Sequence, residues 1–316
     1  MRVLPLAWVL SLYEPFVTSA ALIRPRQDAT QIAQLGGWVE TMTARSNGHL
    51  LLNRLDVPEL WTVNPATQEA SKVLSIPGVL GLTGVAEVAP DVFAVVAGNF
   101  STKTFDIGEG SYAVYRVDLS APSATPPTAA LVQRIPEGAF LLGAASLDND
   151  TVFVADAGTG ALYTLTLSTG AYAVVLADAT TMRAPASAAI REGIHGVKYR
   201  DGALYFTNAF GGTFDRLAVD PATGKPATST DGGVAQVAVI RRDLQGPEDF
   251  ALAADGSAYV AMINGGAVVK VAPDGTTEKV ATASSATTCV LGRTDKDRDT
   301  LYVATSDGAV LSVQVA

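Results

Sequence analysis

Residues 194–210 read IHGVKYRDGALYFTNAF and contain the unit that decides the fold. Its two runs, IHGVKYR and ALYFTNA, are rich in β-branched and aromatic residues with small residues between them, and a polar Asp-Gly turn joins them. Such runs predict antiparallel strands rather than helices. A third run, FDRLAVDPATGK (residues 214–225), ends in Asp-Pro-Ala-Thr-Gly, which is typical of a hairpin turn.

The same unit recurs along the whole chain. Its middle strand follows a polar turn in each copy, at residues 48–54, 91–98, 151–158, 202–209, 256–263 and 300–307. A repeat of roughly 40–60 residues is typical of propellers. The sequence therefore predicts an all-β, six-bladed β-propeller with four antiparallel strands per blade. The last copy is one strand short, and we expect residues 31–37 to supply that outer strand and close the ring.

The composition argues against several function classes. The 316 residues include 22 Lys and Arg against 31 Asp and Glu, a formal net charge of −9, which disfavours nucleic-acid binding through phosphate neutralisation. A single cysteine, Cys289, forms no intramolecular disulfide, and two histidines, His49 and His195, argue against a multi-His metal site. We expect one domain over residues 22–316, a monomer, with no nucleic-acid or membrane partner.

Residues 1–21 show the features of a secretory signal peptide. Arg2 precedes a mostly apolar run from Val3 to Tyr13, and small residues follow at 19–21. The run is too short to span a membrane, and the alternative is a terminal segment that packs on the domain. The signal prediction places the protein in the secretory pathway or outside the cell, where the sequons at Asn99 and Asn149 could be glycosylated.

The innermost strand of each blade should line the central channel. Aligning the six inner segments puts one residue of each at the channel mouth: Glu40, Thr83, Leu142, His195, Asp249 and Thr288. We expect two carboxylates and one imidazole to converge there in a functional pocket, because propeller ligands usually bind at this mouth. The alternative is that the carboxylates are solvated strand ends and that His195 satisfies a local backbone group.

Three stretches resemble the senescence marker protein, gluconolactonase and luciferin-regenerating group of six-bladed propellers. They are residues 38–65 (WVETMTARSNGHLLLNRLDVPELWTVNP), 193–209 (GIHGVKYRDGALYFTNA) and 247–261 (PEDFALAADGSAYVA), and the resemblance covers most of residues 36–312. In enzymatic members it implies one divalent cation, Ca²⁺ or Zn²⁺, at the channel mouth. The family's Glu and Asp ligands match Glu40 and Asp249. Its metal-binding Asn position falls on His195, and its substrate-side Asn position falls on Leu142.

Those two departures alter what the resemblance implies. Leu142 offers no ligand atom, and the nitrogen of His195 suits Zn²⁺ better than Ca²⁺. One alternative is therefore a zinc site made by Glu40, His195 and Asp249, and a lactonase that depends on it. The sequence also resembles fungal hetero-Diels–Alderases of tropolonic sesquiterpenoid biosynthesis. That resemblance implies metal-free dehydration of a hydroxymethyl tropolone to an o-quinone methide and its cycloaddition with a humulene-type alkene.

We therefore predict a metal-independent pericyclase of fungal secondary metabolism, with no cofactor and a small apolar or polycyclic substrate. His195, Asp249 and Glu40 are the predicted acid–base groups. The loop 98–111 (GNFSTKTFDIGEGS) is expected to fold over the mouth as a lid, or alternatively to be an excursion at the rim. The predicted substrate contacts are Trp38, Thr83, Asn99, Phe100, Phe105, Leu142, Asn208, Phe210, Asn264 and Thr288. The alternatives are a lactonase with one Zn²⁺ or Ca²⁺ and a non-catalytic propeller that binds a ligand.

Overall fold

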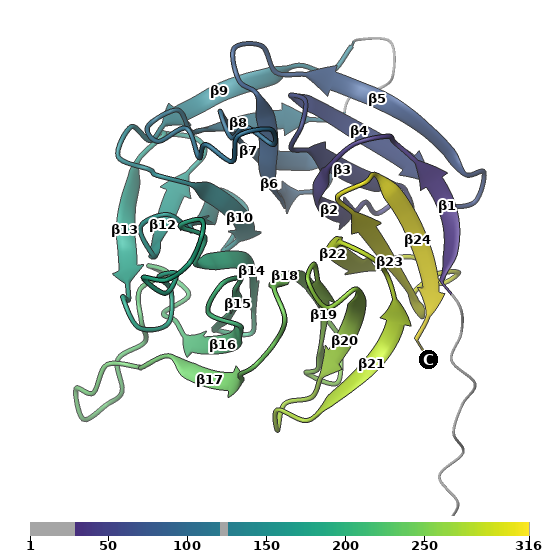
Figure 1. Ribbon diagram of the computed structural model, residues 1–316. Helices are drawn as coiled ribbons and strands as arrows, with labels where there is room; N and C mark the ends of the chain where they lie inside the picture. The colour runs from purple at the N-terminus through teal and green to yellow at the C-terminus, as the bar shows by residue number, and fades with distance from the viewer. Residues whose placement is uncertain (1–28, 121–125, 316) are drawn as a thin grey trace, which may run out of the picture.

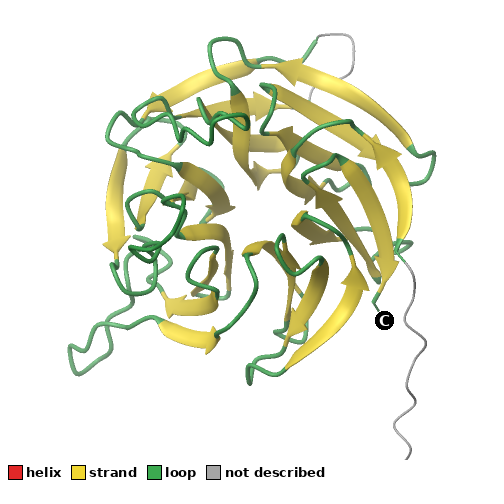
Figure 2. Cartoon of the chain, in the orientation of Figure 1, coloured by secondary structure: helices red, strands yellow, loops and turns green. Residues whose placement is uncertain are grey.

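The computed structural model describes residues 29–120 and 126–315, and it shows six four-stranded antiparallel sheets in a ring around a central axis (Figure 1). These residues form strands and loops throughout (Figure 2). The predicted six-bladed β-propeller is confirmed. The expected signal peptide, residues 1–21, lies outside the described ranges. Within those ranges, no helix has the length and apolar character needed to cross a bilayer.

Five blades begin at the axis and run outward in chain order. The first blade contains β2 (Val39–Ala44), β3 (Leu50–Arg54), β4 (Glu59–Asn64) and β5 (Glu69–Ser75). The second and third contain β6 (Gly81–Ala89), β7 (Val92–Gly98), β8 (Ala113–Asp118), β9 (Ala129–Arg134), and β10 (Leu141–Ser146), β11 (Thr151–Asp156), β12 (Ala161–Thr166), β13 (Tyr172–Ala177). The fourth and fifth contain β14 (Ile194–Arg200), β15 (Ala203–Asn208), β16 (Thr213–Ala218), β17 (Ala238–Arg241), and β18 (Pro247–Leu252), β19 (Ala258–Met262), β20 (Ala267–Val271), β21 (Thr277–Thr282).

The sixth blade joins the two ends of the described chain. It contains β22 (Ala286–Leu291), β23 (Thr300–Thr305) and β24 (Ala309–Gln314), and its outer strand is β1 (Thr30–Gln34). β1 pairs antiparallel with β24, so that Gln34 lies opposite Ala309. The Gln34 side chain also donates to the Asp307 carbonyl at 2.7 Å. The prediction that an N-terminal strand closes the ring is confirmed.

The apolar core lies between neighbouring blades. Val96 and Val114 of the second blade share one buried cluster with Leu141 and Val154 of the third. The middle strands β3 and β7 are buried along their whole length, whereas most of β5 is exposed. Burial of these β-branched and aliphatic faces drives the sheets together, so each blade is held by its two neighbours.

The inner strands approach one another so closely that three positions require glycine. A Cβ atom at Gly84 would lie 2.2 Å from the Leu142 carbonyl oxygen, and one at Gly143 would lie 2.2 Å from the His195 carbonyl oxygen. A Cβ at Gly196 would lie 2.7 Å from Asp249 Oδ1. These contacts fix the backbone next to Leu142 and His195, so the packing at the axis positions the side chains of the inner strands.

The close approach at Gly143 can be tested by the substitution Gly143→Ala. The added methyl group would overlap the His195 carbonyl, and overpacking of this kind costs about 1–3 kcal/mol. We expect a lower free energy of unfolding in urea denaturation. Gly233→Ala is the control, because its Cβ would meet only the side chains of Ser229 and Asp231. Equal stability of the two variants would contradict the steric argument.

Asp215, on β16, should make stability depend on pH. It is fully buried, its Oδ1 has no hydrogen-bond partner, and burial raises its pKa to about 7. The unfolded carboxyl loses its proton near pH 4, whereas the folded one keeps it to about pH 7. The free energy of unfolding should therefore fall by at most about 4 kcal/mol as pH rises from about 4 to 7, and it should then level off. Asp215→Asn should flatten this slope in urea titrations at several pH values. Asp118→Asn, at an exposed carboxyl, should keep the wild-type slope above pH 5; an unchanged slope in Asp215→Asn would refute the assignment.

Candidate active site

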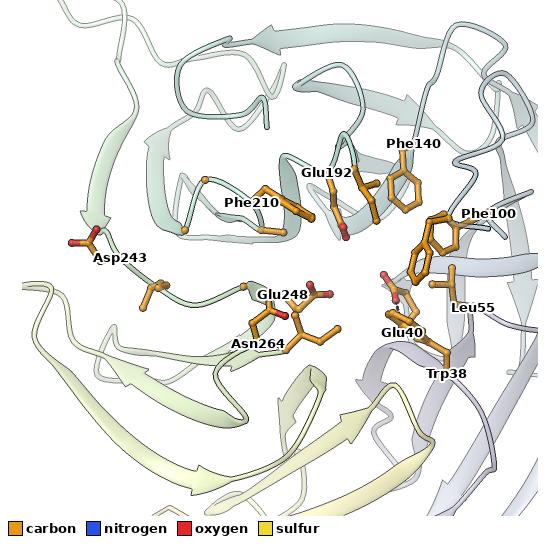
Figure 3. Close-up of a pocket in the computed structure, with 18 residues that line it drawn as sticks. Trp38, Glu40, Leu55, Phe100, Phe140, Glu192, Phe210, Asp243, Glu248 and Asn264 are labelled. Carbon is orange, nitrogen blue, oxygen red and sulfur yellow. Dashed lines mark hydrogen bonds between the residues drawn. The ribbon is translucent and has the colours of Figure 1, made fainter. Parts of the chain in front are cut away.

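A cavity of about 470 Å³ lies at one end of the ring, beside the axis. Aromatic and aliphatic side chains form most of its wall, and three glutamates reach into it. Figure 3 shows the carboxylates of Glu40, Glu192 and Glu248 pointing toward one another, with Trp38 and Phe100 beside them. The cavity is therefore an apolar chamber with one acidic corner. Its main wall residues are Trp38, Leu55, Phe100, Phe105, Phe140, Ile190, Phe210, Leu244 and Ile263.

The acidic corner surrounds one ring nitrogen of His195, which lies on β14 and is 1% exposed. The Nε2 atom lies 2.9 Å from Glu248 Oε2 and 3.2 Å from Glu192 Oε1. It lies 3.4 Å from Glu40 Oε1, and the other oxygen of Glu40 accepts the Trp38 indole N–H at 2.8 Å. Strands β2, β14 and β18 and the loop before β14 thus bring four ionisable groups together; we name these groups the His195 cluster.

The His195 cluster has unusual proton affinities. Burial alone would lower the pKa of His195, but the adjacent carboxylates of Glu248, Glu192 and Glu40 outweigh it and raise that pKa well above its usual range. Burial raises the pKa of Glu248 to about 7, against the opposing charge of His195. Desolvation and like charges are the physical causes. Without a bound ion, the cluster can hold a proton on the imidazole and keep another on a carboxyl near neutral pH.

The same cluster fits a divalent cation by donor type. Ligand atoms of Glu40, His195 and Glu248 all lie within 4.8 Å of one another. His195 Nε2 makes no well-directed hydrogen bond although three carboxylates surround it. One imidazole nitrogen with carboxylate oxygens is a set that Zn²⁺ accepts. The geometry therefore supports two chemistries for one cluster, proton transfer or metal binding.

Asp249 does not belong to the cluster, so its predicted placement beside His195 is wrong. Its Oδ1 lies 2.5 Å from Lys198 Nζ, and its Oδ2 accepts the Thr288 hydroxyl at 3.0 Å. The reason is a one-residue register error. Glu248 and Asp249 occupy a β-bulge between the paired Pro247 and Phe250, as His195 and Gly196 do between Ile194 and Val197. Glu248 is therefore the structural equivalent of His195, and a shift of one residue turns a strand side chain to the other face.

Half of the ten predicted substrate contacts line the cavity: Trp38, Phe100, Phe105, Phe210 and Asn264. The loop 98–111 contributes two of them. Phe100 stacks on Phe140 with ring centroids 4.9 Å apart, and Phe105 meets Phe100 edge-on at 6.2 Å. The loop thus forms a wall of the cavity through stacked aromatic rings.

The other five predicted contacts do not line the cavity, because local structure engages their side chains. Asn208 donates to the carbonyls of Thr181 and Arg183 and accepts the Gly211 N–H. Leu142 packs in the core. The remaining three make hydrogen bonds within a blade or between blades: Asn99 to the Leu80 N–H, Thr83 to the Val96 carbonyl, and Thr288 across to Asp249 of the fifth blade.

Sequence reasoning missed Glu192 and Glu248 of the acidic corner and the wall residues Leu55, Phe140, Ile190, Leu244 and Ile263. Glu248 could have been found by aligning the inner strands on the residue after the mouth position. That residue is glycine in Thr83-Gly84, Leu142-Gly143 and His195-Gly196, and Asp249 takes its place in the fifth blade, which leaves Glu248 at the mouth. Glu192 stands three residues before His195 in a loop, where no strand pattern applies. Phe140 precedes β10 and packs on the loop 98–111, a contact that no local pattern shows.

The fold and cavity define a six-bladed propeller with an ionisable pocket beside its axis. The chain belongs to the SMP-30/gluconolactonase/LRE-like family, whose model matches residues 42–307. It is 28% identical over 297 residues to a Phoma sp. protein named "Putative hetero-Diels-Alderase", covering 85% of this chain and 83% of that one. A Sarocladium schorii protein of the same description is 25% identical over 306 residues, covering 85% and 75%. The gluconolactonase of Xanthomonas campestris shares the fold, with a TM-score of 0.65, 12% identity and coverage of 93% and 99%.

The role assigned to Asp249 can be tested by a double-mutant cycle with Lys198. Asp249→Asn keeps an acceptor for Thr288 but leaves a partly buried ammonium group unpaired, which should cost about 1–3 kcal/mol of unfolding free energy. Lys198→Met in the same chain removes that ammonium group and should restore part of the loss. Urea denaturation of the two single variants and the double variant measures the coupling. Strictly additive effects would contradict the ion pair.

Proposed function

We propose that the protein is a hetero-Diels–Alderase of fungal secondary metabolism that works in the cavity beside the propeller axis. The observation that carries this proposal is the combination of an aromatic-walled chamber of about 470 Å³ with the buried His195 cluster in its acidic corner. The names of the Phoma and Sarocladium relatives support it, and the family includes enzymes by description.

The first step would be dehydration of a hydroxymethyl tropolone. The bond between the methylene carbon and its hydroxyl breaks, the hydroxyl leaves as water with one added proton, and the tropolone hydroxyl gives up one proton. A carboxyl of the cluster, with Glu248 the best placed by its burial, would donate to the leaving hydroxyl. An ionised neighbour such as Glu192 would accept the tropolone proton, so the cluster ends with as many protons as it began.

The second step would join the o-quinone methide to a humulene-type alkene. Its oxygen and its exocyclic carbon form one C–O and one C–C bond to the two alkene carbons, and no proton or external electron is needed. Such a reaction depends on holding two apolar partners in the reacting geometry. Trp38, Phe100 and Phe210 offer flat faces for this purpose, so we assign the walls to positioning and the cluster to proton transfer.

A metal-dependent lactonase is the second candidate, and the donor set of the cluster favours it. Glu40, His195 and Glu248 would hold the cation, which when bound would polarise a lactone carbonyl. The acidic Glu192 would then remain free at the cavity to take a proton from water.

Metal content separates the two candidates. We predict that the purified protein carries far less than one Zn²⁺ or Ca²⁺ per chain by elemental mass spectrometry. Turnover of the tropolone and alkene should survive chelation, because the proposed steps use protons of the chain alone. Stoichiometric metal with chelator-sensitive lactone hydrolysis would replace the first candidate by the second. Binding of the substrates without turnover would leave a non-catalytic propeller.

His195→Ala and Glu248→Gln should each lower kcat at least about 100-fold, the usual scale for loss of a proton-transfer group. Both variants keep or reduce side-chain volume, and circular dichroism should confirm the fold. Glu59→Gln is the matched control, because Glu59 lies on β4 and pairs with Lys72 outside the cavity. Wild-type turnover in either cluster variant would rule out the proposed chemistry.

A further inference from the structure

A second cavity of about 780 Å³ lies next to the first and shares Gly211 with it. The segment between β13 and β14, residues 178–193, borders both cavities. Ile190 and Glu192 face the first, whereas Arg191 lines the second. Nothing in the proposed chemistry uses this second cavity.

The lining of the second cavity is positively charged. Arg183, Arg191 and Arg242 contribute to it and no carboxylate does, although the whole chain carries a formal net charge of −9. Arg191 pairs with Glu109, but Arg183 and Arg242 have no ion-pair partner among the described residues. Nearby acids are engaged elsewhere: Asp178 accepts the Thr180 and Thr181 N–H groups. The charge of Arg242 opposes the rise in the pKa of the buried Asp215, but the two groups form no salt bridge. Two guanidinium groups without a salt-bridge partner in the described part of the chain therefore line one concave site of an acidic protein.

Two hydroxyl groups at the same place lack hydrogen-bond partners. Thr159 Oγ1 and Thr181 Oγ1 are buried and unpaired, and both residues line the cavity. A buried polar atom without a partner is uncommon in folded proteins and costs free energy. Both oxygens lie beneath the cavity surface, so a ligand in the cavity would be held by the exposed arginines.

We propose that the second cavity binds the oxyanion, a carboxylate or a phosphate, of a small organic molecule. Arginine suits this ligand because its planar guanidinium donates two parallel hydrogen bonds to such a group. Arg183 and Arg242 supply the charge. The proposal stands apart from the proposed function, because none of these residues belongs to the His195 cluster.

Isothermal titration calorimetry at low ionic strength tests the proposal, with inorganic phosphate and citrate as the two probes. We expect saturable binding of at least one probe to the wild-type protein, weakened about tenfold in Arg183→Gln and in Arg242→Gln, which is the scale of one charge-assisted hydrogen bond. Added sodium chloride should weaken binding as well.

Arg116→Gln is the matched control, because Arg116 is an exposed arginine of β8 paired with Asp118. It should bind both probes as the wild type does, and all variants should keep the wild-type melting temperature within about 2 °C, since surface substitutions cost little. Preference for one probe identifies the oxyanion and supports the site. Absence of saturable binding to the wild type, or equal binding by Arg242→Gln and Arg116→Gln, overturns the proposal. The turnover of the His195 variants is measured separately, so failure here leaves the proposed function standing.

Discussion

The packing of the inner strands around the axis is the constraint on which the rest of the structure depends. At Gly143 and Gly196 the neighbouring backbone leaves no space for a side chain, so the strands cannot slide or rotate relative to one another. Glu40, His195 and Glu248 come from three blades and are far apart in the sequence, yet this frame holds them within a few ångströms. A rigid frame lets the chemistry at the mouth vary by one side chain while the blades stay unchanged.

The His195 cluster works against the stability of the propeller that holds it. Three carboxylates around one imidazole, almost free of solvent, combine desolvation with like-charge repulsion. Such an arrangement persists when the surrounding packing determines it, and it is common at sites selected for chemistry. The stacked rings of Phe100 and Phe140 line the same cavity, and an apolar wall of this kind strengthens charge interactions beside it.

Sequence alone predicted the blades well, because each strand carries its own turn and its own apolar residues. It also placed Glu40 and His195 at the mouth and Trp38, Phe100 and Phe210 in the wall. It failed by one residue at Asp249, since a β-bulge breaks the simple alternation by which strand faces are counted. The sequence could not predict the place of Glu192, because this residue lies in a loop whose position is set by the two blades that it connects. Asn208, which we expected to meet substrate, is used by its own turn.

The pairing of β1 with β24 has a consequence for the order of events during synthesis. β1 is the first described strand to leave the ribosome, and its partner, Ala309–Gln314, lies at the other end of the described chain. During translation of the residues between them, the edge that β1 will cover does not exist, and β1 itself has no strand to pair with. The ring therefore remains an open arc until β24 has been synthesised, and the unpaired strand edges of that arc can pair with other chains, which favours aggregation.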